Sequence, residues 1–287
     1  MDDMNDKVCL ITGATSGIGL ATAIGLAERG ARILLIARNG ADGEEARQAI
    51  GARCGRDDAA RVLIADLASL AAVRKVADEV LESEPQLDVF VHSAGVVPWE
   101  RRESADGNEL AFAVAYLSCF LLVNLLLERL KESAPARIVI VTGDYQRKAT
   151  LRGRLNADDL NCVHDYTPRR AGGQETLAKV LFTLELAHRL EGSGVTANCL
   201  HPGAVRTNLM RNAPWYTRAL LAVAAPFMRS PERAARTPIF LAADPEAASL
   251  NGQYVIDETP RDPNPEAQDA AMRAQLWEVS ATMCGLA

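Results

Sequence analysis

The stretch Thr12-Gly13-Ala14-Thr15-Ser16-Gly17-Ile18-Gly19 decides the fold of this chain. An apolar run, Val8 to Ile11, comes before it, and a helical pattern, Leu20 to Arg29, follows it. A strand, a glycine-rich turn and a helix in this order form a cradle for a mononucleotide. The alternative is a purely structural glycine turn, but the flanking strand and helix favour the phosphate site.

Each of the three glycines in this stretch has a physical reason. Gly13 allows the tight turn, Gly17 lets the backbone approach a pyrophosphate, and Gly19 lets the helix pack close to the strand. The start of the helix presents free N–H groups and a partial positive charge, and both attract phosphates. The sequence therefore predicts a dinucleotide cofactor.

Outward from this unit, apolar runs alternate with helical patterns, which indicates repeated βαβ units and a parallel sheet. We expect one α/β domain over residues 1–287, a doubly wound Rossmann sheet of about seven strands without repeats or linkers. Further strands are expected over Ala31–Ala37, Arg61–Leu67, Leu87–Val91, Gly194–Leu200 and Gln253–Ile256 and within Arg137–Gly143. Further helices are expected over Ala41–Arg53 and Ser69–Ser83, with Ser69 as the N-cap.

Composition indicates an ordinary globular protein, with 48% hydrophobic and 24% charged residues. The net charge of −6 gives no basic footprint for nucleic acid. Six scattered cysteines favour free thiols in a reducing compartment and no metal site. Met1 to Asp6 is polar and acidic, so we expect a cytoplasmic protein without a secretory signal. Leu110 to Leu127 approaches the length of a membrane span, but Tyr116, Ser118 and Asn124 interrupt it, and we expect it in the core.

The spacing of the glycines is G-x-x-x-G-x-G, and with Thr12 it resembles the short-chain dehydrogenase/reductase superfamily. His92-Ser93-Ala94-Gly95 stands where that family shows an Asn-Asn-Ala-Gly turn, and Asp66-Leu67 where it holds the adenine. His201 to Thr207 matches the Pro-Gly-x-Val-x-Thr segment that flanks the nicotinamide. Leu181-Phe182-Thr183 and Leu276 to Ser280 are similar to the retinol-dehydrogenase branch, so the resemblance runs nearly end to end.

The end of the second strand selects between the two nicotinamide cofactors. An acidic residue there would accept hydrogen bonds from the adenosine ribose, but this chain has Ala37-Arg38-Asn39. Arg38 can bind a 2′-phosphate, which favours NADP(H), and the alternative is an ordinary surface arginine. With the resemblance, the predicted cofactor contacts are Gly13, Thr15, Ser16, Gly17, Ile18, Gly19, Arg38, Asn39, Asp66, Leu67, Ser93, Ala94, Gly95, Pro202, Gly203, Val205 and Thr207.

The resemblance also implies a proton relay of Asn, Ser, Tyr and Lys, and here the chain departs from the family. Matching the segments along the chain places Ala115, Gly143, Gly172 and Thr176 at these four positions. A Tyr-x-x-x-Lys motif occurs nowhere in the sequence. The residues expected to bind the cofactor are thus present, whereas the side chains of the proton relay are missing. This combination favours a protein that still uses a dinucleotide.

A ketone reductase without this relay needs another proton source, because losing a general acid usually costs about 10²–10⁴ in rate. The candidate side chains are Ser93, Thr142, Asp144 and Tyr145, with Ser118 and His201 as weaker ones. Alternatively, the substrate supplies the proton from a phenol beside its carbonyl. The emptied relay and the Ala- and Arg-rich composition are similar to atypical ketoreductases of angucyclinone antibiotic tailoring, so we expect a hydroxylated aromatic polyketide ketone as substrate.

Three segments depart from the βα pattern: residues 143–170, residues 209–230 and the tail 257–287 with its amphipathic helix. Long loops at the carboxyl edge of a parallel sheet bind substrates, so 209–230 is either a substrate lid or a helical cap over the core. The expected partner is a small aromatic ketone, with no nucleic acid or membrane and with a possible homodimer. Two other functions stay open, namely non-redox chemistry on this fold and an NADP(H)-binding pseudoenzyme.

Overall fold

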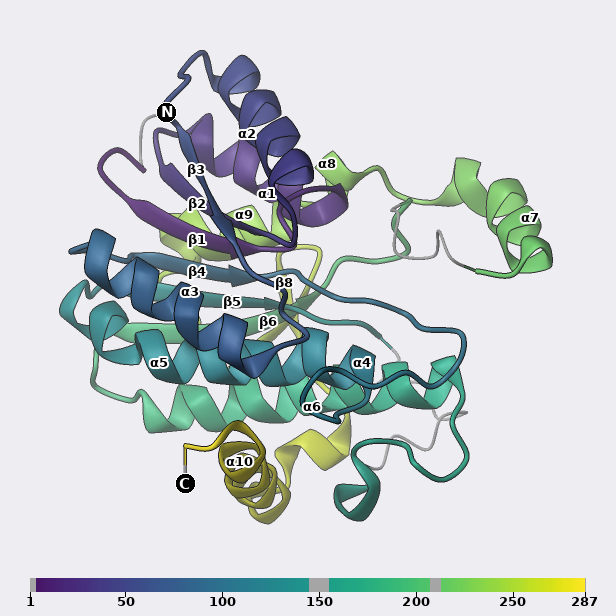
Figure 1. The fold of residues 1–287 in the computed structure, drawn as a ribbon. Coiled ribbons are helices and arrows are strands. Elements are labelled where there is room, and N and C mark those ends of the chain that lie inside the picture. The colour runs from purple at the N-terminus through teal and green to yellow at the C-terminus, as the bar shows by residue number, and fades with distance from the viewer. Residues whose placement is uncertain (1–3, 145–154, 207–212, 287) are drawn as a thin grey trace.

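One eight-stranded sheet forms the centre of the computed structural model, which describes residues 4–144, 155–206 and 213–286. The strand order is β3-β2-β1-β4-β5-β6-β7-β8 (Figure 1). The crossover from β3 back past β1 to β4 is the doubly wound arrangement that the sequence predicts. The strands are β1 Val8–Thr12, β2 Arg32–Ala37, β3 Ala60–Ile64, β4 Val89–His92, β5 Ala136–Val141, β6 Val195–His201, β7 Tyr254–Ile256 and β8 Thr259–Arg261.

Helices cover both faces of this sheet and enclose two separate cores (Figure 1). On one face lie α1 (Gly17–Ala27), α2 (Gly40–Cys54) and α9 (Arg236–Ala243). On the other lie α3 (Leu70–Ser83), α5 (Ser118–Glu132) and α6 (Pro168–Arg189). The remaining helical elements in the described part of the chain are α4 (Leu110–Phe112), a π-helical turn (Ala113–Leu117), α7 (Trp215–Ala224), α8 (Pro231–Ala234), α10 (Ala270–Cys284) and four short 3-10 turns.

The α/β Rossmann fold is confirmed, but the strand prediction is incomplete. Seven strands run parallel, as expected, while β8 pairs antiparallel with β7 at the edge of the sheet. The third strand ends at Ile64, so Asp66 and Leu67 lie in the loop beyond it. Ser69 caps α3 as predicted, because its hydroxyl accepts a hydrogen bond from the backbone N of Ala72.

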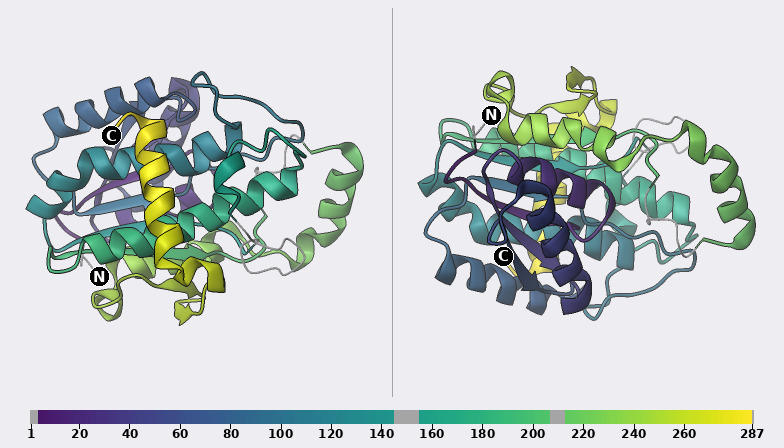
Figure 2. Two further views of the ribbon diagram at one scale, coloured as in Figure 1. Left: turned by 90° about the horizontal axis from the view of Figure 1, so that it is seen from below. Right: turned by 90° about the horizontal axis from the view of Figure 1, so that it is seen from above.

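The helix α10 crosses the outer side of α5 and α6 (Figure 2). The ring of Trp277 in α10 lies edge-to-face with that of Phe120, with centroids 5.1 Å apart, and 5.7 Å from the tilted ring of Phe182. The Tyr116 hydroxyl lies 2.7 Å from that of Ser280, fully buried. The amphipathic helix of the tail therefore completes a core, and a homodimer through α5 and α6 would meet α10 on that surface.

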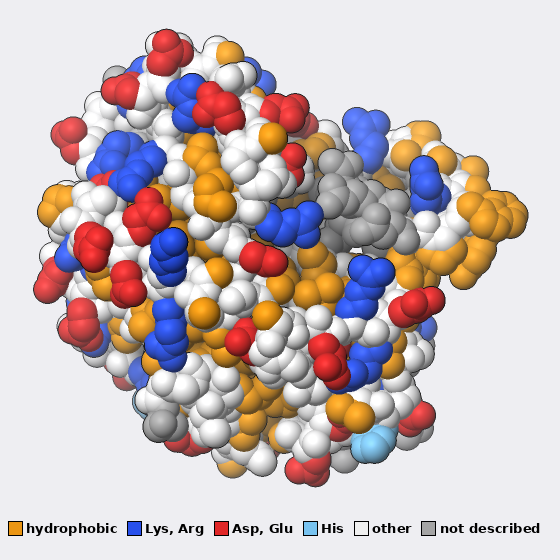
Figure 3. Space-filling view, viewed as in Figure 1, with side chains coloured by type: hydrophobic (Ala, Val, Ile, Leu, Met, Phe, Trp, Pro, Cys, Tyr) orange, Lys and Arg blue, Asp and Glu red, His pale blue; other side chains and the backbone are white. Residues whose placement is uncertain are grey.

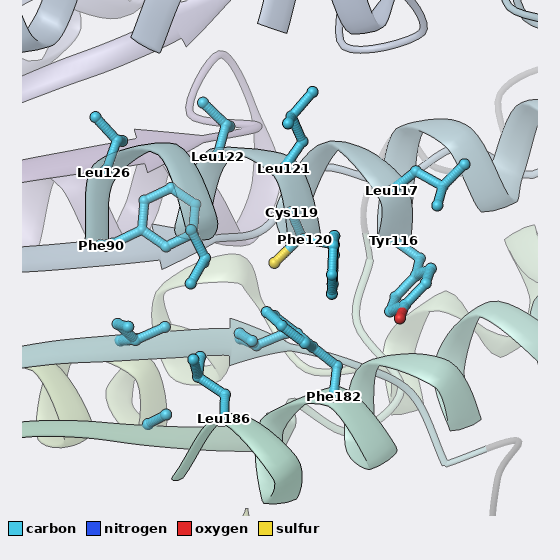
Figure 4. Packing of buried hydrophobic residues seen from close by; sticks show 14 of the residues in the cluster. Phe90, Tyr116, Leu117, Cys119, Phe120, Leu121, Leu122, Leu126, Phe182 and Leu186 are labelled. Carbon is cyan, nitrogen blue, oxygen red and sulfur yellow. The ribbon is translucent and has the colours of Figure 1, made fainter. Parts of the chain in front are cut away.

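The apolar segment Leu110–Glu132 belongs to the core beneath α10. It is 23 residues long with a mean hydropathy of 2.4, long and apolar enough to cross a bilayer, and 72% of its most apolar window is buried in the fold. Its Phe120 points towards Phe182 of α6, while Leu121 and Leu122 point to the opposite side of the helix, and all three belong to the buried core (Figure 4). Burial explains the apolar composition of this helix, as the interruptions in its sequence predict.

The segment expected to act as a lid stands apart from the sheet. Helix α7 projects beside the carboxyl edge of the strands, with apolar side chains gathered at its outer end (Figure 3). Trp215, Val223 and Phe227 are 79%, 75% and 91% exposed. Because none of these side chains belongs to either buried core, α7 does not cap the core, and the lid interpretation stays a prediction.

Candidate functional site

The glycine turn between β1 and α1 is a tightly closed cradle. Gly13 has a φ of +67°, and a Cβ there would lie 2.7 Å from the backbone N of Ala94. A Cβ at Gly19 would lie 2.2 Å from the carbonyl O of Gly13. Side chains at either position would collide with backbone, so the turn requires glycine, as the sequence predicts.

The first turn of α1 is open to an anion. Its N-cap residue, Ser16, is exposed and extended, and its side chain makes no capping hydrogen bond within the described residues. The first turn contains no acidic residue. Backbone N–H groups at the start of a helix attract phosphate, so the geometry and charge of this turn fit the pyrophosphate of a dinucleotide.

The adenosine end of the predicted site lies beside β2 and β3. Arg38 is exposed directly after β2, where its guanidinium has room to meet a phosphate. Asn39 caps α2 by accepting a 2.9 Å hydrogen bond from the backbone N of Asp42, which leaves less of its side chain for a ligand. Asp66 is exposed after β3 and accepts a hydrogen bond from the backbone N of Ala68 at 3.0 Å.

Below the cradle, a chain of hydrogen bonds joins Thr12 to the π-helical turn through His92. The Thr12 hydroxyl oxygen accepts from the backbone N of Ser93 at 3.1 Å and of Ala94 at 3.2 Å. Its proton is therefore directed to Nδ1 of His92, 2.9 Å away. Nε2 of His92 then carries the ring proton and donates it to the carbonyl O of Ala115 at 3.1 Å.

His92 is a neutral imidazole, and sequence reasoning did not identify it as part of the site. Burial lowers its pKa to about 3, with the positive charge of Lys179 as the second cause. The histidine binds the end of β4 to the π-helical turn at Ala115. Its replacement of the first Asn of the family turn was the available signal, since a histidine at that point can bridge two elements with its two ring nitrogens.

The structure places the four predicted relay positions around the ends of β5 and α6. Ala115 is buried in the π-helical turn, and Gly143 follows β5. Gly172 and Thr176 lie one turn apart in α6. The Thr176 hydroxyl donates to the carbonyl O of Gly172 at 2.7 Å, so it is folded back on its own helix. The assignment of these positions to the family relay stays a prediction.

Two of the candidate proton donors already give their protons to backbone carbonyls. The Thr142 hydroxyl donates to the carbonyl O of Thr176 at 3.0 Å, and the Ser118 hydroxyl to that of Val114 at 2.7 Å. Asp144 accepts a 3.4 Å hydrogen bond from the Tyr254 hydroxyl. Ser93, by contrast, is half-buried beside the cradle.

The nicotinamide end of the predicted site lies in the loop after β6. His201 is the last residue of this strand, and Gly203 has a φ of +85°. A Cβ at Gly203 would lie 2.8 Å from Nε of Arg229, which packs against this turn. Two backbone hydrogen bonds hold the same contact, from Arg229 N to Ala204 O at 2.8 Å and from Arg206 N to Arg229 O at 3.0 Å. The end of the predicted lid is thus fastened to the cofactor loop.

Two of the predicted site residues, Tyr145 and Thr207, lie outside the described residues, as does part of the lid. Among the residues that the structure does describe, no cluster of three or more His, Cys, Asp or Glu side chains is arranged to hold a metal ion. The site therefore consists of a nucleotide cradle, a neutral histidine bridge and hydroxyls that are largely engaged.

Comparison with known proteins agrees with this geometry. The family model described as short chain dehydrogenase matches residues 7–151. Human retinol dehydrogenase 14 is 41% identical over 300 residues, covering 99% of this chain and 88% of that protein. A putative uncharacterized protein from Mycobacterium Paratuberculosis has a TM-score of 0.77 at 29% identity, covering 98% of this chain and 94% of that one. The Pseudomonas aeruginosa RhlG/NADP active-site complex has a TM-score of 0.70 at 26% identity, covering 88% and 95%.

Proposed function

Because the chain belongs to the short-chain dehydrogenase family, we propose that it is an NADPH-dependent ketoreductase of hydroxylated aromatic polyketides of the angucyclinone type. This chain is an oxidoreductase of that family, and its cofactor is NADP(H). When bound, NADPH supplies the hydride that forms the new C–H bond at the carbonyl carbon. The proposal concerns the substrate and the origin of the proton.

The observation that carries the proposal is the engagement of the hydroxyl groups. Thr142, Thr176 and Ser118 all donate their protons to backbone carbonyls at 2.7–3.0 Å. A proton taken from any of them would break a hydrogen bond and leave an alkoxide, and both changes are costly in a buried site. Compared with these three hydroxyls, the substrate is the better proton source.

A phenol beside the carbonyl meets this requirement. As the hydride adds to carbon, the carbonyl electron pair moves to oxygen, and this oxygen takes the phenol proton. The products are an alcohol and a phenolate, which takes one proton from solvent later. A phenol titrates near about 10 and water near about 15.7, and this gap corresponds to about 8 kcal/mol. The missing general acid accounts for roughly 3–5 kcal/mol, so the phenol is sufficient.

The surroundings of the site are consistent with a flat aromatic substrate. Gly172 and Gly173 lie inside α6, where each glycine costs the helix about 1 kcal/mol relative to alanine. A Cβ at Gly173 would meet nothing within 4 Å, so there is open space beside this turn. We propose that the rings lie along α6 and that the apolar side chains of α7 cover them. The free cysteines agree with the cytoplasmic location that forms part of the proposal.

The test compares 1-hydroxyanthraquinone with 1-methoxyanthraquinone as substrates, following NADPH oxidation by absorbance. We expect turnover with the hydroxyl compound and a rate at least about 10²-fold lower with the methoxy compound, because the methoxy group has no proton to give. Equal rates would contradict the substrate-derived proton. Consumption of neither compound despite NADPH binding would favour the pseudoenzyme, and conversion without NADPH consumption would favour non-redox chemistry.

A second prediction concerns the choice of cofactor. Replacing Arg38 with alanine removes a charged donor for the 2′-phosphate, and we expect NADPH to bind about 10-fold or more weakly while NADH binding is unchanged. Fluorescence titration of both cofactors measures this selectivity. Arg53→Ala is the matched control, since Arg53 is an exposed residue of α2 whose partner is Glu28. Parallel weakening of both cofactors by Arg38→Ala would contradict the phosphate contact.

A further inference from the structure

A buried ion pair lies on α6 directly behind the predicted relay positions. Nζ of Lys179 is 2.7 Å from Oε2 of Glu175, and their side chains are 6% and 15% exposed. Among the described residues, Lys179 is the only lysine or arginine that is buried. Burying an ammonium and a carboxylate is costly, and replacing such a pair with apolar residues is often neutral or stabilising. Stability alone therefore does not account for this pair.

The position of Lys179 on the helix aims its charge towards the site. Gly172, Thr176 and Lys179 are spaced four and three residues apart, so they share one side of α6. The Thr142 hydroxyl contacts the Thr176 carbonyl, so this side of the helix faces the end of β5. Helical side chains lean back towards the N-terminus, and the ammonium of Lys179 accordingly reaches Glu175, the residue directly before Thr176. Ahead of Lys179, this side of α6 carries only two predicted relay positions. One is Gly172, which has no side chain, and the other is Thr176, whose hydroxyl is bonded back to its own helix.

The other titratable groups around Lys179 leave it as the local positive charge. His92 of β4 is neutral, and burial raises the pKa of the thiols of Cys119 in α5 and Cys199 in β6. Burial also raises the pKa of the Glu175 carboxyl and that of Glu109, which caps α4 and lies close enough to Glu175 for their charges to interact. Arg101, beside Glu109, lowers the pKa of that carboxyl.

We propose that Lys179 is a positioning residue for the proton transfer: its ammonium, held by Glu175 behind Thr176, stabilises the phenolate that reduction leaves on the substrate. This inference rests on the proposed function, since it requires a phenol in the pocket. It assigns the task of charge stabilisation to a group one turn beyond the predicted relay lysine position. Lys179 acts through its field and not by giving up a proton.

The experiment titrates the visible absorbance of 1-hydroxyanthraquinone bound to the protein without cofactor. Charges a few ångströms apart in a partly buried site interact strongly enough to shift a pKa by about one unit or more. We expect the pKa of the bound phenol to rise by about one unit in Lys179→Met, where the cation is lost. We expect the phenol pKa to fall below the wild-type value in Glu175→Gln, where only the negative counter-charge is lost. In Lys179→Arg, which keeps the positive charge, we expect the wild-type phenol pKa.

These opposite signs separate a field effect from a structural one. A merely structural role would lower activity in both variants and leave the phenol pKa unchanged, and that result would overturn the proposal. We also expect kcat with NADPH to fall roughly 10-fold in Lys179→Met, in proportion to the phenolate that is destabilised.

A double variant and the wild-type protein serve as controls for this experiment. Lys179→Met leaves Glu175 buried without its partner, so the double variant Lys179→Met/Glu175→Gln, which carries neither charge, replaces it if the single variant does not fold. Its phenol pKa is expected above that of Glu175→Gln, and equality would overturn the role of Lys179. Failure of the wild-type protein to bind or reduce 1-hydroxyanthraquinone overturns the proposed function itself. Reduction by the wild type with the same phenol pKa in every variant overturns only the inference about Lys179.

Discussion

Replacing Gly19 with valine is expected to abolish NADPH binding, with a dissociation constant at least about 100-fold higher. A Cβ at this position lies 2.2 Å from the carbonyl O of Gly13, and the colliding atom is backbone that cannot rotate away. To relieve the collision, α1 has to move off β1, which displaces the N–H groups that would bind the pyrophosphate. Fluorescence titration with NADPH measures the loss.

The control for this variant is Gly40→Ala. Gly40 opens α2, and a Cβ there would meet nothing within 4 Å. We expect unchanged NADPH binding and a slightly higher melting temperature, because alanine favours the helix. If Gly19→Val keeps a native circular-dichroism spectrum and binds NADPH as tightly as the wild type, the turn is not the cofactor cradle.

Replacing His92 with glutamine is expected to destabilise the protein strongly at pH 8 and much less at pH 5. At pH 8 the variant lacks the well-fitted hydrogen bonds that His92 makes with Thr12 and Ala115. Buried polar groups are then poorly paired, which lowers the free energy of unfolding by about 2–4 kcal/mol. The wild-type imidazole has a pKa of about 3 when folded and about 6.5 when unfolded. Between these values the unfolded chain binds the extra proton, so wild-type stability falls as the pH falls.

Each pH unit below about 6.5 lowers the free energy of unfolding of the wild type by up to about 1.4 kcal/mol through His92. The glutamine variant does not lose this stability, because glutamine does not titrate. Urea unfolding at pH 8, 6 and 5 measures the difference between the two proteins, which should narrow with acid. His188→Gln is the control, because His188 is exposed on α6 beside Glu191. A difference that stays constant across this pH range would show that folding does not lower the pKa of His92.

The nucleotide half of the fold could be predicted from the sequence because its signals are local. Gly13 and Gly19 are needed by turn geometry, which a short stretch of sequence contains. The alternation of strands and helices likewise follows from periodicity, and Ser69 shows that a capping residue can be identified from its position before an apolar run. These features do not depend on which distant segments come together.

The eighth strand could not be predicted because its residues, and those of the turn before it, are not typical of a strand and a hairpin. Pro260 lies in β8 and is tolerated there since β8 is an edge strand. The two-residue turn before it places Asp257 and Glu258 at φ values of +51° and +61°, where Gly or Asn is the usual sequence signal. Ion pairs to Arg229 and Arg236, distant in sequence, accompany this turn.

The chemistry of the site is non-local, and that limited the sequence-based prediction. Thr142 is a plausible acid in the sequence, and only the contact between the loop after β5 and α6 shows that its proton is directed to the Thr176 carbonyl. Lys179 and Glu175 have the i, i+4 spacing of an ordinary surface pair, and only the fold shows that they are buried. Residue type and spacing do not distinguish a solvated ion pair from an enclosed one.

The position of α10 has a consequence for synthesis on the ribosome. Phe182 of α6 is translated 95 residues before Trp277, and Phe120 of α5 is translated 157 residues before it, and Trp277 packs on both rings. Until residues 270–284 emerge, the nascent chain presents an aromatic surface to solvent, and such surfaces bind chaperones and aggregate. A premature stop before Ala270 should therefore yield insoluble protein even though every strand of the sheet has been made.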